Sequence, residues 1–208
     1  MMPETIQQAL DTLGQELPAG AADQLAELLG ELARWNQKVN LTAIREPAAM
    51  ISGHLLDSLA VRPFLKGTRI LDVGTGAGFP GLPLAIAEPE RHFELVDSNN
   101  KKIQFVQHVA ARLGLANVRA VKARSEDYAP DERFDTVLAR AVAALPELIR
   151  IAGHLLDRDG VFIALKGRYP AEELKALPDT WSYSVEMLDI PGLETGSRHV
   201  VLMQPKKP

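Results

Sequence analysis

The stretch RILDVGTGAGFPG, residues 69–81, decides the fold of this chain. Its apolar start ends at the carboxylate of Asp72, and glycines then recur at every second position, which is the pattern of a strand that leads into a ligand-binding turn. Glycine allows positive φ in such a turn, and it lets a ligand approach main-chain N–H groups without a Cβ in the way. Pro80 suits the first turn of a following helix, so the stretch predicts strand, turn and helix in that order.

The glycines by themselves fit two cofactors. Gly76, Gly78 and Gly81 have the G-x-G-x-x-G spacing of dinucleotide-binding enzymes, and Asp97 lies 19 residues beyond Gly78. Asp72 separates the alternatives, because a carboxylate ahead of the turn would repel a pyrophosphate but complements the ammonium and sulfonium groups of S-adenosylmethionine (SAM). We therefore favour SAM over a nicotinamide cofactor.

The composition bounds the class of protein. The 208 residues, 46% of them apolar, are enough for one domain with a small appendage. No apolar run is long enough to span a bilayer, and the start, Met1-Met2-Pro3-Glu4, lacks the basic and apolar regions of a secretion signal. The absence of cysteine excludes a disulfide, a cysteine nucleophile and a cysteine-rich zinc site. We expect a cytoplasmic location and no metal centre, since the five histidines do not cluster and His108 lies among apolar residues of a predicted helix.

The charge is unevenly distributed. The net charge is −4, yet residues 1–33 hold six acidic side chains and no Lys or Arg. Residues 34–208 therefore carry all 23 basic side chains and the other 21 acidic ones, so that local basic patches are possible there.

Helical patterns fill the chain before the glycine turn. One apolar stripe recurs at three- and four-residue spacing, and it indicates a helix that packs on the main domain: Ala22, Leu25, Leu28, Leu29, Leu32 and Trp35. A second helix is predicted over Pro47 to Val61. We expect residues 1–65 to form a helical extension and residues 66–208 to form the cofactor-binding domain.

From Arg69 onward, apolar runs alternate with helical patterns, which predicts βαβ units and a mostly parallel sheet. The predicted strands lie near 69–73, 92–97, 117–123, 134–139 and 160–165, and the predicted helices lie near 79–87, 99–113 and 144–156. Two further strands, Trp181 to Ile190 and His199 to Gln204, are expected to form an antiparallel edge. The fold class is therefore an α/β, Rossmann-like sheet of seven strands.

Polar groups follow each of the first five predicted strands. They are Gly74 to Gly78, Asp97, Arg124-Ser125-Glu126, Arg140 and Lys166-Gly167. In an open α/β sheet, ligands bind at the carboxyl ends of the strands. We expect these groups to meet on one rim.

Two carboxylates of this rim have candidate roles toward SAM. Asp97 is placed to accept hydrogen bonds from the ribose hydroxyls, and its alternative role is to start the following helix. Ser125 and Glu126 fit the adenine edge, and the alternative is that Glu126 is a solvated acid.

Arg140 is a lone charge in the apolar run Leu138 to Val142. Since an unpaired buried cation is very costly, Arg140 must face a cleft or form an ion pair, and Asp72 and Asp135 are the candidate partners. We favour the cleft, because charges held in clefts tend to be functional.

Several separated motifs agree with one family: Trp35-Asn36 with Asn40-Leu41-Thr42, His54 with Asp57-Ser58-Leu59, Asp72 to Gly81, Asp97, Lys101-Lys102, Ala139-Arg140-Ala141 and Leu165-Lys166-Gly167. From about Leu32 to Val201 the chain resembles the bacterial small-subunit rRNA guanine-N7 methyltransferases, the RsmG (formerly GidB) family. It departs from that family at Ser197, where many members have glutamate before Arg198-His199.

The resemblance implies a class I SAM-dependent methyltransferase that acts on a guanine in the decoding-region loop of 16S rRNA. Its SAM contacts would be Gly74, Phe79, Ser125, Glu126 and Arg140. Guanine N7 carries a lone pair and no proton, so we expect no general base. Arg140, His54 and Lys166 would instead position the reactants.

RNA binding requires cations around the target nucleotide, and the candidates are His54, Lys101, Arg124, Arg140, Lys166, Arg198 and His199. Lys101 and Lys102 fit a solvated helix face equally well. Phe79, Tyr169 and Trp35 are the candidates to stack on the target base. We expect 16S rRNA or the small ribosomal subunit as partner, no membrane contact, and a monomer.

Two other functions stay open at this stage. One is a small-molecule methyltransferase, since neither an Asn/Asp-Pro-Pro-aromatic turn for exocyclic amines nor a cysteine for cytosine carbon is present after the fourth strand. The other is a non-catalytic ribosome-assembly factor that binds SAM or RNA as a ligand.

Overall fold

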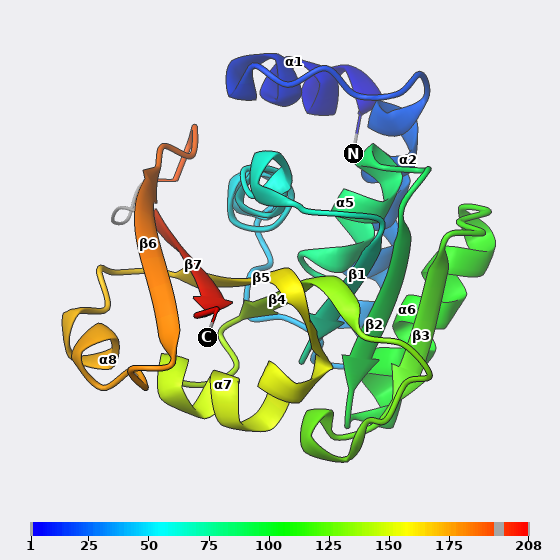
Figure 1. Ribbon diagram of the computed structural model, residues 1–208. Coiled ribbons are helices and arrows are strands. Elements are labelled where there is room, and N and C mark those ends of the chain that lie inside the picture. Colours follow the sequence, from blue (N-terminus) through cyan, green and yellow to red (C-terminus); the bar gives the residue numbers. More distant parts are fainter. Residues whose placement is uncertain (1, 194–197, 208) are drawn as a thin grey trace.

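A computed structural model describes residues 2–193 and 198–207 of the chain, so Ser197 lies outside the described residues. The molecule is built on one seven-stranded sheet in the order β3-β2-β1-β4-β5-β7-β6 (Figure 1). Helices lie on both faces of the sheet, as expected for βαβ units.

The strands confirm the predicted fold class. Their bounds are β1 Arg69–Val73, β2 His92–Asp97, β3 Val118–Lys122, β4 Phe134–Arg140, β5 Leu156–Lys166, β6 Trp181–Leu188 and β7 Arg198–Pro205. The first five strands pair in parallel, and β7 pairs antiparallel with both β5 and β6. The sheet is therefore mostly parallel, with the antiparallel C-terminal edge that the sequence predicts.

The helices follow the predicted order, with additions at both ends. Their bounds are α1 Pro3–Leu13, α2 Ala21–Asn36, α3 Pro47–Met50, the π-helix η1 Ile51–Leu56, α4 Asp57–Leu59, the 3-10 helix η2 Arg62–Phe64, α5 Gly81–Ala87, α6 Asn100–Arg112, the 3-10 helix η3 Ser125–Asp127, α7 Leu145–Ala152, the 3-10 helix η4 Gly153–Leu155 and α8 Ala171–Lys175. The structure has no helix long and apolar enough to cross a membrane among the residues it describes.

Two predicted helices differ from the structure. The segment predicted as one helix from Pro47 to Val61 contains a π-helical stretch in the middle, and its last α-helical residue is Leu59. The helix predicted to reach residue 156 ends at Ala152, and β5 begins at Leu156 because that residue pairs with Phe134 ahead of a register shift in the sheet. Such an irregularity leaves no signal in the apolar pattern.

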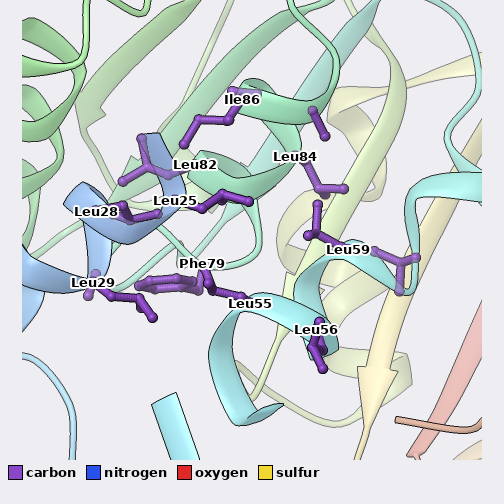
Figure 2. Close-up of a cluster of buried hydrophobic side chains, with 14 of the residues drawn as sticks. Leu25, Leu28, Leu29, Leu55, Leu56, Leu59, Phe79, Leu82, Leu84 and Ile86 are labelled. Atoms are coloured by element: carbon purple, nitrogen blue, oxygen red, sulfur yellow. The ribbon is translucent and has the colours of Figure 1, made fainter. Parts of the chain in front are cut away.

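The N-terminal helices are part of the main core. Leu25, Leu28 and Leu29 of α2 lie beside Phe79, with α5 and the helix that carries Leu55 close by (Figure 2). Each of these leucines is at most 1% exposed, and full burial of one such side chain contributes about 1.5–3 kcal/mol. The packing role predicted for the α2 stripe is thereby confirmed. We keep the division into residues 1–65 and 66–208 as a proposal.

Candidate functional site

The glycine turn has the backbone geometry that its sequence predicts. Gly74, Gly76 and Gly78 have φ of 63°, 63° and 83°, values that favour glycine. A Cβ added to Gly76 would meet only the Gly74 carbonyl oxygen, at 3.9 Å, so the space in front of this residue is open. Pro80 precedes α5 as its N-cap instead of lying inside its first turn.

Asp72 stabilises the turn through two hydrogen bonds to its Oδ2. Its Oδ2 accepts hydrogen bonds from Thr75 Oγ1 at 2.7 Å and from the Gly81 main-chain N–H at 2.9 Å. Its Oδ1 is buried and has no partner among the described residues. Burial raises the pKa of this carboxyl to about 6, against the opposing effect of its two hydrogen bonds. Asp72 thus fastens both ends of the turn and leaves one buried oxygen open to a donor.

A hollow of about 270 Å³ lies beside the turn, at the carboxyl ends of β1 to β4. Its lining includes three of the five polar groups expected on one rim, but neither Arg140 nor Lys166-Gly167: Gly74, Asp97, Ser98, Lys102, Ala123, Arg124, Ser125, Glu126, Ala141, Val142 and Ile151. Four separate strand ends therefore contribute to one concave site, as expected for this sheet topology.

Asp97 joins the turn to the next helix. Its Oδ2 accepts a hydrogen bond from the Gly76 N–H at 3.0 Å, and its Oδ1 accepts one from the Asn99 N–H at 2.8 Å. Asn99, not Asp97, caps α6, because its side chain accepts a hydrogen bond from Lys101 N. Asp97 therefore keeps unused lone pairs beside the hollow.

The third strand end is more open. Ser125 is buried, whereas Glu126 is exposed and lies 3.9 Å from Arg124 Nη1. Arg124 keeps 69% of its side chain exposed, and Lys101 is exposed at the start of α6. Both cations are exposed to solvent, although Arg124 lies within ion-pair distance of Glu126.

Arg140 forms an ion pair, and its partner is neither Asp72 nor Asp135. Its Nη1 donates to Asp57 Oδ2 at 3.0 Å and to the Gly53 carbonyl at 3.1 Å. Asp135 instead accepts hydrogen bonds from the main chain at the start of β1. The two candidate partners were wrong, because Asp57 comes from α4 of the N-terminal helical segment, 83 residues before Arg140, and such a long-range contact leaves no local signal in the sequence.

Asp57 binds a second arginine. Its Oδ1 accepts a hydrogen bond from Arg198 Nε of β7 at 3.0 Å, and the residue is only 2% exposed. Sequence reasoning placed Asp57 within a family motif but assigned it no role. The signal that could have identified it is a carboxylate within a helical stretch of mostly apolar and small residues, where a charge must find a partner.

His54, in η1 of the N-terminal extension, lies between Thr42 and Arg140. Its Nδ1 is 3.3 Å from Arg140 Nη2, and its Nε2 is 3.0 Å from Thr42 Oγ1. Since a guanidinium only donates, Nδ1 accepts and Nε2 carries the proton. Burial, together with the nearby Arg140 guanidinium, lowers the pKa of His54 to about 4, so the ring is neutral at pH 7.

The surroundings of His54 restrict it in two further ways. Its ring stacks on Phe79 with 4.7 Å between the centroids. Asn36 holds the Thr42 segment, because Asn36 Oδ1 accepts hydrogen bonds from the N–H groups of Leu41 and Thr42. Hydrogen bonds thus connect Asn36 to Thr42, Thr42 to His54 and His54 to Arg140.

Lys166 and His199 differ from the free cations that we expected. Lys166 Nζ donates to Glu173 Oε2 at 2.7 Å and to the Ala143 carbonyl at 2.9 Å, which leaves it 16% exposed. His199 is 9% exposed on β7. The partner acid of Lys166 lies on α8, beyond the motif, so neither burial nor pairing was visible in the sequence.

The aromatic candidates separate clearly. Phe79 is 3% exposed under His54, and Trp35 packs edge-on against Phe105. Tyr169 is 56% exposed, with its ring 5.6 Å from that of His199. Of these three residues, Tyr169 is exposed, Trp35 is half-buried and Phe79 is buried.

No cluster of three His, Cys, Asp or Glu side chains in residues 2–193 and 198–207 has the arrangement of a metal site. His108, considered above as a structural or solvated residue, lies 3.0 Å from Glu31 Oε2. It is far from the glycine turn in sequence and joins α6 to α2.

Comparison with known proteins places the chain among methyltransferases. Residues 21–201 match the family model described as rRNA small subunit methyltransferase G. A protein of that name from Idiomarina loihiensis is 45% identical over 97% of this chain and 98% of its own length. Another, from Salmonella arizonae, is 42% identical over 99% of this chain and 100% of its own length.

Solved structures show the same fold at low identity. A SAM-dependent methyltransferase from Aquifex aeolicus has a TM-score of 0.57 and 17% identity, over 76% of this chain and 93% of its own. Precorrin-6y C5,15-methyltransferase from Geobacter metallireducens has a TM-score of 0.52 and 16% identity, over 80% and 90% of the two chains.

Proposed function

We propose, from the premise that this chain belongs to the rRNA small subunit methyltransferase G family, that it methylates N7 of one guanine in the decoding-region loop of 16S rRNA. The chain is a SAM-dependent rRNA methyltransferase. The observation that carries the assignment is the family match over residues 21–201, which spans both the glycine turn and the Arg140 cluster.

The residues around the hollow fit SAM. The open space at Gly76 admits a ligand against the backbone, and the unpartnered Oδ1 of Asp72 suits a cationic ligand. Asp97 would accept hydrogen bonds from the ribose, while Ser125 and Glu126 would contact the adenine. Gly74, Gly78 and Phe79 complete the proposed binding set through the turn that they form, together with Arg140, whose guanidinium lies 5.7 Å from the centre of the Phe79 ring. When bound, SAM supplies an electrophilic methyl group.

N7 is the acceptor atom that best fits the side chains at the site. His54 is neutral, its Nδ1 faces a guanidinium and its Nε2 faces Thr42. Its nitrogens are therefore engaged, and it is not placed to remove a proton from a substrate. A nucleophile that carries no proton, such as guanine N7, needs no such base. Arg140, His54 and Lys166 would act by holding the reactants in place.

The rim supplies candidate RNA contacts. Arg124 and Lys101 are exposed beside the hollow, and Arg198 keeps 27% of its side chain exposed. Tyr169 is the proposed stacking residue for the target base, since it is exposed on the same side as the β5 end. We also propose that the chain acts as a monomer in the cytoplasm, where its rRNA substrate is made.

The product test uses labelled SAM with deproteinised 16S rRNA, mature small subunits and free guanosine. We expect label in RNA only, at one nucleotide. Because N7-methylguanosine has a labile glycosidic bond, borohydride and aniline should cleave the modified rRNA at that position. Transfer should also fall steeply as salt rises, since each phosphate contact releases counterions.

Other outcomes identify the alternatives. Equal activity on free guanosine would indicate a small-molecule methyltransferase. Binding of SAM and rRNA without any methyl transfer would indicate a non-catalytic assembly factor. Label on a ribose hydroxyl or an exocyclic amine would contradict the N7 assignment.

A further inference from the structure

A buried carboxylate joins two arginines at the ends of β4 and β7, and one of them, Arg140, lies 5.7 Å from the centre of the Phe79 ring. Asp57 is 2% exposed, and each of its oxygens accepts a hydrogen bond from a different guanidinium at 3.0 Å. Arg140 comes from the end of β4, and Arg198 comes from the start of β7. Three segments that are distant in sequence thus meet at one side chain.

The charges of this cluster do not cancel. Arg140 and Arg198 contribute two positive charges and Asp57 one negative charge, while burial keeps the adjacent His54 neutral. Counted over the described residues, the Arg140–Asp57–Arg198 cluster carries one net positive charge. Without Asp57, two like charges would have to stay close together at a partly buried position, which is unfavourable.

The two arginines differ in the groups they leave free. Arg140 uses Nη1 for Asp57 and Gly53, directs Nη2 to His54, and keeps 19% of its side chain exposed. Arg198 binds Asp57 through Nε, and its Nη groups have no acceptor within residues 2–193 and 198–207, while 27% of its side chain is exposed. Arg198 is therefore the side chain of the cluster that is available to a ligand.

The absence of a side chain at Gly167 leaves space for the Arg198 guanidinium. A Cβ at this position would lie 3.0 Å from Arg198 Nη1, which is closer than side chains normally approach. The Lys166-Gly167 pair at the end of β5 thus borders the cluster directly, and a larger residue would displace the guanidinium.

We propose that Asp57 is a positioning residue, which fixes Arg198 beside Arg140 so that the Nη groups of Arg198 bind a phosphodiester group of the RNA substrate. This proposal rests on the proposed function. An anionic oxygen group is the ligand that a bidentate guanidinium with free Nη groups recognises. The SAM carboxylate is the other source of such a group, but neither Arg198 nor Asp57 lines the hollow beside the glycine turn, which favours RNA.

The test relies on the sign of a charge change. Asp57→Asn removes one negative charge from a rim that binds a polyanion. The change in net charge alone therefore predicts tighter RNA binding. Positioning predicts the opposite, because the arginines lose their shared acceptor and separate. We expect the dissociation constant for deproteinised 16S rRNA to rise about tenfold, and the slope of log affinity against log salt to decrease by about 0.9.

Glu46→Gln is the matched control. It adds the same charge at the exposed start of α3, where Glu46 makes no ion pair with any residue in the described ranges. This variant should bind rRNA at least as tightly as the native chain. Asp57→Glu, which keeps the carboxylate, should recover part of the lost affinity, a recovery that a charge effect alone does not explain.

Arg198→Lys keeps the proposal testable if Asp57→Asn does not fold. This variant preserves the charge at a partly exposed position but loses the Nε–H donor to Asp57 and the paired Nη groups. We expect weaker rRNA binding, with the calorimetric affinity for SAM and the melting temperature close to native values.

RNA binding is measured here without methyl transfer, so failure of the proposed reaction and failure of this proposal are distinguishable. Native or tighter rRNA binding by Asp57→Asn, or by Arg198→Lys, would overturn the positioning role. Loss of SAM affinity with unchanged rRNA affinity would also overturn it, since the anion would then be the SAM carboxylate.

Discussion

The two sides of the sheet rim are built in different ways. The side at β1, β2 and β3 consists of one continuous turn, whose backbone is fastened by Asp72 and Asp97 over at most 21 residues of sequence. The side at β4, β5 and β7 consists of charged side chains, and the Arg140–Asp57 and Arg198–Asp57 contacts join residues 83 and 141 positions apart. Local backbone conformation thus forms the cofactor side, and long-range ion pairs form the side assigned to RNA.

This difference predicts how each side fails. A turn that depends on positive φ is lost when a side chain is added, whatever the charge of that side chain. A cluster of ion pairs is lost when its geometry changes, even if the charge is preserved. Variants of the two sides should therefore affect different steps, SAM binding on one side and RNA binding with methyl transfer on the other.

The largest effect is expected for Gly76→Val. A β-branched side chain opposes φ of 63° and fills the open space in front of the turn, so SAM binding should be lost while the protein remains folded. Calorimetric titration with SAM measures the affinity. Gly114→Val is the control, because Gly114 has φ of 66° and open space around it but lies at the end of α6, away from the hollow. Equal loss of SAM affinity in both variants would contradict the assignment of the turn as the SAM-binding site.

Arg140→Ala should have the next largest effect. It removes the residue that contacts Asp57, His54 and Gly53, and we expect methyl transfer to fall by about 100-fold or more, in the range seen when a positioning group is lost. Stability should decrease little, since Asp57 keeps Arg198 as a partner. A single-turnover assay and a thermal melt decide between the roles, with exposed Arg150→Ala as control. An unfolded Arg140→Ala protein would favour a purely structural ion pair.

The same contrast explains what the sequence could predict. The seven strands, their mostly parallel pairing and the turn at Gly74 to Gly78 follow from patterns within about ten residues, which record local conformation directly. The hollow followed as well, because a parallel sheet brings its carboxyl ends to one edge. Asp72 was expected to complement the positive charges of SAM, which stays a prediction, and its hydrogen bonds in the structure are with Thr75 and Gly81 of its own turn.

The contacts between residues far apart in the sequence could not be predicted from such local patterns. Arg140 was expected to pair with Asp72 or Asp135, and its actual partner, Asp57, lies on a helix of the N-terminal extension. Lys166 and His199 were expected to contact RNA, and no sequence pattern indicated that Glu173 pairs with Lys166 or that His199 is only 9% exposed. Partner choice depends on how distant segments pack, and a single sequence contains no direct record of that.

The smallest effect concerns pH and the link between the extension and Arg140. Burial lowers the pKa of His54 from 6.5 to about 4, so the unfolded chain binds a proton that the folded chain excludes between these values. Stability contributed by the neutral ring is complete above pH 6.5 and is lost as pH falls. Between pH 7 and 5 the loss amounts to about 2 kcal/mol of unfolding free energy.

His54→Gln should remove this part of the pH dependence. Urea titration at both pH values gives the unfolding free energy of the native and variant proteins. The difference between the two proteins isolates the contribution of His54, because the opposite contribution of Asp72, whose pKa is raised to about 6, is present in both. His92→Gln replaces an exposed histidine at the start of β2 and should retain the native slope. Identical slopes in all three proteins would contradict a buried, neutral His54.

The division of the rim into a cofactor side and an RNA side is tested most directly by a crystal structure of the chain with S-adenosylhomocysteine. We predict that the ligand occupies the hollow bordered by Gly74, Asp97 and Ser125, against the open face of Gly76, while Arg198 stays bound to Asp57 and makes no contact with it. Density for the ligand between Arg198 and the end of β5, with the hollow empty, would contradict the account.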